Sequence, residues 1–220
     1  MNINELQQRL ESIYEIDTTY QVESFIFSNA ALARQLDNTP SAREIPEKLL
    51  VREHDHGMDV SLYLDAQLLA NLSKHNPLEN LQHHNLADFC HLVEGVSHFV
   101  YLVWNARHGR PVTQLELEIQ AEIDKYVTCA AVLAQQDNGR IPKELHELLF
   151  EQVRFDTQLQ GEELKRYVLA NEYAKRYCRI LHTTLLRLGN GLLITKEIRR
   201  FYRLLKNQKI ERINSMTTLH

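Results

Sequence analysis

The stretch that decides the fold is NLADFCHLVEGVSHFVYLVWNARH, residues 85–108, which contains the single tryptophan of the chain. With 100° allowed per residue, its apolar side chains form one broad helical stripe. The stripe consists of Leu86, Phe89, Leu92, Val93, Val96, Phe99, Val100 and Val103. The pattern predicts a core helix that has Asn85 as its N-cap and ends at Gly109-Arg110-Pro111.

The opposite face of this helix carries the residues most typical of a metal site. His91, Glu94 and His98 fall within about 60° of one another, and an imidazole–carboxylate–imidazole trio is a partial site for zinc or iron. Glu118 or Glu122 of the next helix would complete it. However, Glu94 and His98 are four residues apart, whereas the Glu-x-x-His of di-iron bundles needs three. The His-Glu-x-x-His of zinc proteases is absent as well.

Polar residues opposite a strong apolar stripe are most simply a solvated face, and we expect this for His91, Glu94 and His98. The same interpretation is favoured for Glu118 and Glu122, since Lys125 lies at helical spacing from both.

Outward from this stretch, the remaining chain is mostly helical. Only 7 Gly and 5 Pro occur among 220 residues, which favours long elements. The patterns predict helices at about 3–13, 22–36, 66–75, 114–136, 142–155 and 159–188, and a basic helix capped by Thr195. The first two would form an antiparallel hairpin of helices. Gly189-Asn190-Gly191 would stop the long helix.

One segment has a different period. In MDVSLYLD, residues 58–65, apolar and polar residues alternate, which is typical of a half-buried strand. The preceding KLLVREH can pair with it across Asp55-His56-Gly57, where Gly57 supplies a positive φ. We therefore predict a β-hairpin at about 48–64, which must pack on the helices or pair with another strand, such as one from a second copy.

These elements predict a mainly α protein, a bundle-like single domain of about seven to nine helices with one inserted β-hairpin. Residues 1–193 would form the helical domain. Residues 194–220 would be a basic C-terminal helix and a patternless tail from Asn214, docked on the same domain.

Charge is distributed unevenly along the chain. The net charge is −4, but residues 194–212 contain seven basic and two acidic residues, so this segment is +5 and the remainder is −9. Its basic residues include Lys196, Arg199, Arg200, Arg203 and Lys206. Docking on the acidic body, an acidic protein partner, and nucleic acid or a membrane surface all fit this segment.

Other function classes are excluded by what the sequence lacks. The three cysteines are odd in number and widely spaced, so we expect free thiols in a reducing cytoplasm rather than a disulfide framework. The first residues do not have the pattern of a signal peptide. Neither a membrane-spanning run nor a phosphate-binding loop, a nucleophile elbow or a dinucleotide fingerprint is expected.

The sequence therefore favours a non-catalytic, cytoplasmic protein-binding protein with no cofactor, whose partner is another protein or a second copy of this chain. This interpretation rests on the charge asymmetry, the hairpin edge and the helix at 159–188. In that helix Tyr173 and Tyr177 lie among arginines, and both residue types are enriched at interfaces. The alternative is a metal-dependent helical enzyme that uses zinc or iron at His91, Glu94 and His98. A further alternative is nucleic-acid binding through the basic segment.

Overall fold

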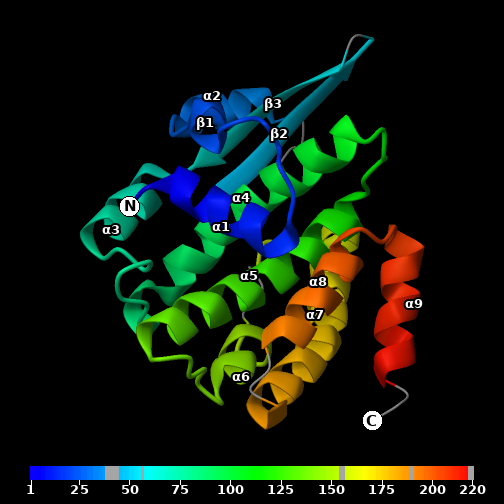
Figure 1. Cartoon of the computed structure of the whole chain (residues 1–220). Coiled ribbons are helices and arrows are strands. Elements are labelled where there is room, and N and C mark those ends of the chain that lie inside the picture. Colours follow the sequence, from blue (N-terminus) through cyan, green and yellow to red (C-terminus); the bar gives the residue numbers. More distant parts are fainter. Residues whose placement is uncertain (38–44, 56, 154–156, 189–190, 218–220) are drawn as a thin grey trace.

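The structure is a computed structural model that describes residues 1–37, 45–55, 57–153, 157–188 and 191–217. Nine helices and a three-stranded sheet lie within these ranges (Figure 1), so the mainly α fold with a β-hairpin is confirmed. The helices are α1 (Ile3–Tyr14), α2 (Ala30–Leu36), α3 (Ala66–Lys74), α4 (His83–Arg107), α5 (Gln114–Gln136), α6 (Leu145–Phe150), α7 (Gly161–Leu188), α8 (Gly191–Tyr202) and α9 (Lys206–Thr217).

The predicted hairpin consists of β2 (Glu47–His54) and β3 (Gly57–Leu64), which pair antiparallel. Gly57 has a φ of +145°, as the turn requires, while His56 lies outside the described residues. The base of the hairpin packs on α4, and its outer half projects from the helices (Figure 1).

The predicted helix over 22–36 is wrong. A 3-10 turn, η1 (Val22–Phe25), leads into a two-residue strand, β1 (Ile26–Phe27), which pairs parallel with β3 at Leu62 and Tyr63. Asn29 then starts α2, because its Oδ1 accepts from the backbone N–H groups of Ala31 and Leu32. Pairing with a distant strand therefore outweighs the local helical pattern.

Helix α4 is buried on nearly every side and belongs to one continuous core that includes residues from α1 to α9. It begins at His83, two residues before the predicted N-cap, because Asn85 instead accepts from the Gln82 backbone N–H at 2.8 Å. By length and composition α4 is long and apolar enough to cross a membrane. However, 67% of its most apolar window is buried inside the protein, as in a core helix.

The predicted helix at 114–136 agrees with α5, which Thr113 caps. Of the predicted helix over 142–155, the described residues form only α6, and residues 154–155 lie outside the described ranges. The basic segment is not one helix from Thr195, because α8 begins at Gly191 and α9 follows a break at 203–205. Both helices contribute core residues. Residues 189–190 of the predicted helix stop and residues 218–220 of the predicted tail lie outside the described residues.

Candidate functional site

The face of α4 that the sequence pattern assigns to solvent is covered in the structure. Helix α5 packs along it and β2 lies against it (Figure 1). His98 is 7% exposed, and the side chain of Glu94 is 12% exposed. The prediction of a solvated face is therefore wrong for Glu94 and His98, because their polar groups face polar groups of α5 and β2 instead of water. His91 is half-buried.

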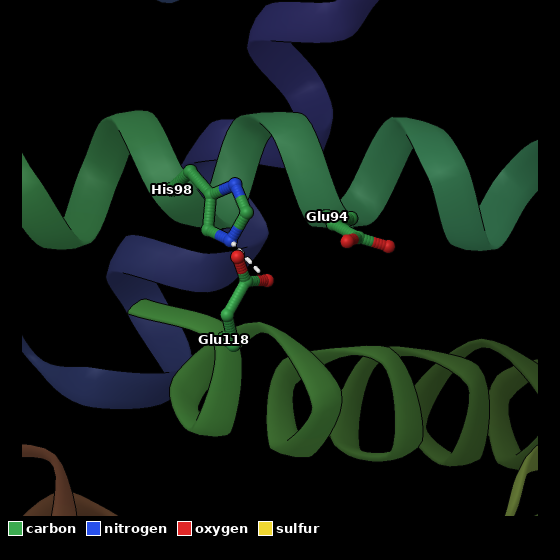
Figure 2. Close-up of side chains that lie close together, drawn as sticks. All are labelled: Glu94, His98 and Glu118. Carbon is green, nitrogen blue, oxygen red and sulfur yellow. Dashed lines mark ion pairs between the residues drawn. The ribbon is translucent and has the colours of Figure 1, made fainter. Parts of the chain in front are cut away.

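Three side chains lie close together: Glu94 and His98 from α4, and Glu118 from α5. Figure 2 shows the His98 ring facing the Glu118 carboxylate, with Glu94 beside them. The four-residue spacing places Glu94 and His98 one turn apart on the same face. One ligand atom from each of the three residues lies within 4.8 Å of the others. Two carboxylates and an imidazole are ligand types that divalent transition metals take in proteins.

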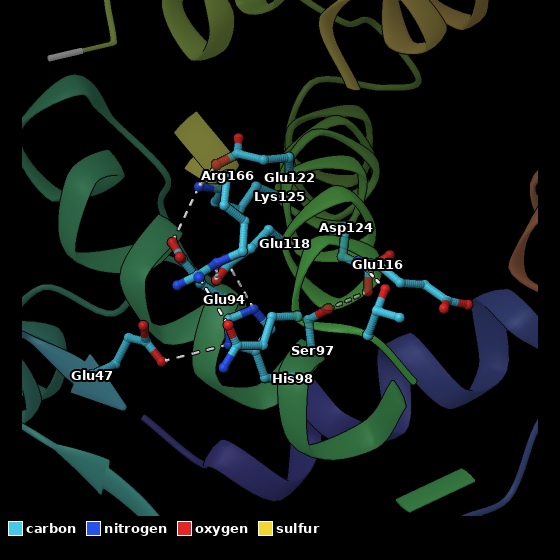
Figure 3. A network of polar contacts seen from close by, with 12 residues as sticks. Glu47, Glu94, Ser97, His98, Glu116, Glu118, Glu122, Asp124, Lys125 and Arg166 are labelled. Carbon is cyan, nitrogen blue, oxygen red and sulfur yellow. Dashed lines mark hydrogen bonds and ion pairs between the residues drawn. The ribbon is translucent and has the colours of Figure 1, made fainter. Parts of the chain in front are cut away.

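Seven ionisable side chains surround this point, and we call them the histidine cluster (Figure 3). They are Glu47, Glu94, His98, Glu118, Glu122, Lys125 and Arg166. Lys125 Nζ lies 2.6 Å from Glu122 Oε1 and 3.1 Å from Glu94 Oε2. The expected pairing of Glu122 with Lys125 is thus present. Its expected place in solvent is wrong, because these side chains are only 14% and 15% exposed.

Burial and mutual charge shift the pKa values in this cluster. Burial opposes the charged form of His98, but the carboxylates of Glu118, Glu47 and Glu94 prevail and raise its pKa to about 9. Burial, with the charge of Glu94, raises the pKa of Glu47 to about 8. Burial also opposes the charge of Glu94, yet Lys125 and His98 lower its pKa. The imidazolium of His98 therefore stands among the carboxylates as a positive centre.

The histidine cluster leaves buried polar atoms without hydrogen-bond partners among the described residues. They are Glu47 Oε2, His98 Nε2 and Arg166 Nε. His98 Nε2 is 3.5 Å from Glu118 Oε2, which makes an ion pair but not a well-formed hydrogen bond. Each buried atom of this kind costs about 1–3 kcal/mol, so native proteins contain few of them. A bound ligand would satisfy such atoms.

A second buried network lies on another side of α5, and we call it the aspartate cluster; Figure 3 shows Ser97 and Asp124 of this network. Its members are Tyr14, Ser97, Gln120, Asp124 and Lys209. Asp124 accepts hydrogen bonds from the Tyr14 hydroxyl, from Ser97 Oγ at 2.6 Å and from Gln120 Nε2 at 2.7 Å. Lys209 Nζ donates to Gln120 Oε1 at 2.5 Å. These five side chains have no buried polar atom without a partner among the described residues.

Comparisons with protein-family models, with curated proteins and with solved structures found no match to the chain. The chemistry of the site is therefore inferred from its geometry.

The structure separates the predicted metal residues. Glu94 and His98 are brought together with Glu118, which was one of the two residues expected to complete the site. His91 does not belong to this group of three, and Glu122 faces Lys125. Because α5 meets α4 near His98, the carboxylate that completes the trio comes from the start of α5.

Most of the basic segment makes contacts within the molecule. Arg199 donates to the Ile13 carbonyl at 2.8 Å and Arg203 to the Glu15 carbonyl at 3.0 Å, at the end of α1. Arg212 pairs with Glu197 at 2.8 Å, and Lys209 is 0% exposed. Lys196 and Arg200 are exposed, and Lys206 is half-buried.

The two predicted interface tyrosines occupy different surroundings. Tyr177 is 0% exposed, and its ring stacks on Phe201 with centroids 4.1 Å apart. Tyr173 is half-buried, with the Arg176 guanidinium 5.2 Å from its ring centroid. Tyr177 is therefore part of the core, and Tyr173 alone has a surface-facing part.

Glu47 and Arg166 were missed by reasoning from the sequence. Glu47 is the first residue of β2, and Arg166 lies near the start of α7, so both reach the cluster through tertiary packing. The only local signal is Gly95, a helical glycine between two suspected ligands. It marks a close approach of another element.

Proposed function

We propose that the chain binds one divalent transition-metal ion through Glu94, His98 and Glu118. The observation that carries this proposal is the convergence of three buried ligand atoms within 4.8 Å, with His98 Nε2 lacking a hydrogen-bond partner among the described residues. A cluster of acidic residues alone would not be specific, but here a buried imidazole nitrogen faces the carboxylate of Glu118, with that of Glu94 close by, which is a donor set for a metal ion.

The ligand types favour zinc, iron(II) or manganese(II). An imidazole nitrogen suits zinc and iron, and carboxylate oxygens are accepted by all three ions. Calcium and magnesium take oxygen ligands almost exclusively, so an imidazole disfavours them. Three protein ligands from α4 and α5 would hold these helices together at their crossing.

Positive charge already present in the cluster favours a reversible site. His98, as an imidazolium, occupies the position between the carboxylates that a cation would take. An ion that binds Nε2 must displace its proton, because only neutral imidazole is a ligand. Ion binding and the protonation of His98 therefore compete.

Two surface cavities among the described residues lie away from the histidine cluster. The larger described surface cavity, about 390 Å³, lies between α1 and α5 and is lined by residues such as Arg9, Ile13 and Val132. The second is lined by α1 and residues 17–21. No member of the histidine cluster lines either cavity. We therefore propose ion binding and assign no reaction.

Paired variants test the proposal. Purified protein is stripped with a chelator, titrated with Zn²⁺ at pH 8 by calorimetry and analysed for metal content. We expect one ion per chain, loss of binding in His98→Gln, and near-normal binding in His91→Gln, the same substitution two turns earlier on α4. The proposal is overturned if the wild type takes up no stoichiometric zinc, iron or manganese, or if His98→Gln binds as well as the wild type.

We infer protein binding as a second candidate function, supported by the hairpin. In the order β1-β3-β2, strand β2 is an edge of the described sheet, and Val51 in its projecting half is 43% exposed. An exposed edge strand is a template for pairing with another chain, and a second copy would supply an identical strand. Light scattering tests this: we expect a dimer in the wild type and a monomer in Val51→Lys, and a monomeric wild type overturns self-association.

A further inference from the structure

Glu47 is the point at which the β-hairpin reaches the histidine cluster. It is the first residue of β2, and its carboxylate points toward His98 (Figure 3). Glu47 Oε2 lies 4.0 Å from His98 Nδ1, on the nitrogen opposite the one that faces Glu118. The Glu47 side chain is 11% exposed, and its Oε2 has no hydrogen-bond partner among the described residues.

The close approach of Glu47 depends on Gly95 of α4. A Cβ atom at Gly95 would lie 3.2 Å from Glu47 Oε2, and 3.1 Å and 3.4 Å from side-chain carbons of Leu62 and Leu64. All three neighbours belong to the base of the hairpin. The missing side chain therefore makes room for β2 and β3 to rest on α4 beside His98.

The base of the hairpin is firmly packed, while its outer half is not. Leu62 and Leu64 are both 0% exposed, and the Asp65 N–H donates to the Pro46 carbonyl at 2.9 Å next to the Glu47–Leu64 pair. By contrast, residues 51–55 of the hairpin are exposed. Glu47 therefore belongs to the packed base that carries the projecting half of the hairpin, and a movement of its carboxylate acts on that base.

We propose that Glu47 is the positioning carboxylate for His98: it accepts the Nδ1–H hydrogen bond, aims Nε2 at the ion, and couples ion binding to the β2–β3 hairpin. A histidine that binds a metal through one ring nitrogen commonly donates the other N–H to a carboxylate, which fixes the tautomer and orientation of the ring. Here that carboxylate comes from a strand, while the ligands come from helices. This inference rests on the ion site proposed above.

Ion binding should therefore shorten the contact between Glu47 and His98. At 4.0 Å the two atoms are too far apart for a hydrogen bond, which requires about 2.7–3.2 Å. With Nε2 bound to an ion, the ring carries its remaining proton on Nδ1, and Glu47 Oε2 is the acceptor that faces it. The Glu47 side chain then ties the first residue of β2 to His98 of α4.

The test compares Glu47→Gln with Glu53→Gln, a matched change at the exposed outer end of the same strand. Each full-length protein is titrated with Co²⁺, whose visible absorption reports the ligand geometry, and amide hydrogen exchange of β2 and β3 is measured with and without the ion. In the wild type and Glu53→Gln we expect the ion to slow exchange in the hairpin. In Glu47→Gln we expect roughly 10- to 100-fold weaker binding, an altered Co²⁺ spectrum and no slowing.

A second variant guards against a simple folding defect. Gly95→Ala removes no charged group but pushes Glu47 Oε2 away from α4, because the new Cβ would lie 3.2 Å from it, and we expect the same loss of coupling between the ion and the hairpin. If the wild type binds no ion, the proposed function itself fails. If the wild type binds the ion and Glu47→Gln matches its affinity, spectrum and hairpin exchange, only the role of Glu47 is overturned.

Discussion

The two buried polar clusters on α5 are similar in burial but differ in completeness. In the aspartate cluster, three donors from α1, α4 and α5 surround Asp124, and Gln120 Oε1 in turn accepts a hydrogen bond from Lys209. In the histidine cluster, Glu47 and His98 each keep a buried atom without a hydrogen bond among the described residues. A closed network needs nothing further from outside the chain, whereas an open one is stabilised by a ligand.

The aspartate cluster should give the largest effect on stability. Asp124→Ala removes the common acceptor of Tyr14, Ser97 and Gln120 and leaves the buried hydroxyl groups of Tyr14 and Ser97 without it. We expect a loss of about 3–5 kcal/mol in the free energy of unfolding, the usual cost of breaking a buried charged network from one side. Urea unfolding at pH 7 measures it. A loss below about 1 kcal/mol would mean that water replaces the missing carboxylate and that the network is not closed.

Neutralising a carboxylate of the histidine cluster should raise the free energy of unfolding, whereas removing Asp124 lowers it. Folding raises the pKa of Glu47 from its ordinary 4.5 to about 8, so the folded state holds this proton more tightly than the unfolded state. The resulting stabilisation is complete below pH 4.5 and is lost as the pH rises to about 8. The pKa of His98 is raised from 6.5 to about 9, so its contribution to stability is lost as the pH rises between these two values.

Glu47→Gln should therefore stabilise the ion-free protein at alkaline pH, on the order of 2–3 kcal/mol at pH 9, and change little at pH 5. Thermal and urea unfolding at the two pH values check this. Asp124 provides the contrast. Burial raises its pKa only to about 6, so the stabilisation that comes from its bound proton is already lost at that lower pH. Identical pH profiles for Glu47→Gln and the wild type would show that Glu47 is ionised in the folded protein at all these pH values.

The sequence predicts elements well where the signals are local. Helix α5 is found because Thr113 caps its start and Asp137-Asn138-Gly139 ends it, and the hairpin is found from alternation and Gly57. The failure at 22–36 is of another kind, since Ile26 and Phe27 become a strand only beside β3. Local propensity is overridden there by tertiary pairing.

The candidate site shows the same limit. Glu94 and His98 are found because they lie one turn apart on one helix, and Glu118 is one of the two carboxylates of the next helix that were expected to complete the site. Their burial cannot be predicted, since polar residues opposite an apolar stripe look the same whether water or a second polar helix faces them. Glu47 and Arg166 lie 51 and 68 residues from His98 in sequence, and no periodicity relates residues so far apart.

An intermediate effect is expected in the dependence of ion affinity on pH. Because His98 must lose a proton to become a ligand, we expect the association constant to rise about tenfold per pH unit between pH 6 and 8. Calorimetric titration with Zn²⁺ in two buffers of different ionisation enthalpy also counts the proton released. The pKa of His98 near 9 sets the upper end of this range. An affinity independent of pH would mean that a neutral His98 already faces the carboxylates.

The smallest effect is expected for an ion pair outside both clusters. Lys165 Nζ lies 2.7 Å from Glu162 Oε1 on α7, closer than Lys125 lies to Glu94, but its two side chains are 74% and 87% exposed. Water screens such a pair and replaces it when it is broken, so Lys165→Ala should change the free energy of unfolding by no more than about 0.5 kcal/mol. Urea unfolding beside Lys125→Ala makes the comparison. Equal losses in the two variants would show that burial does not increase the contribution of the Lys125 ion pairs to stability.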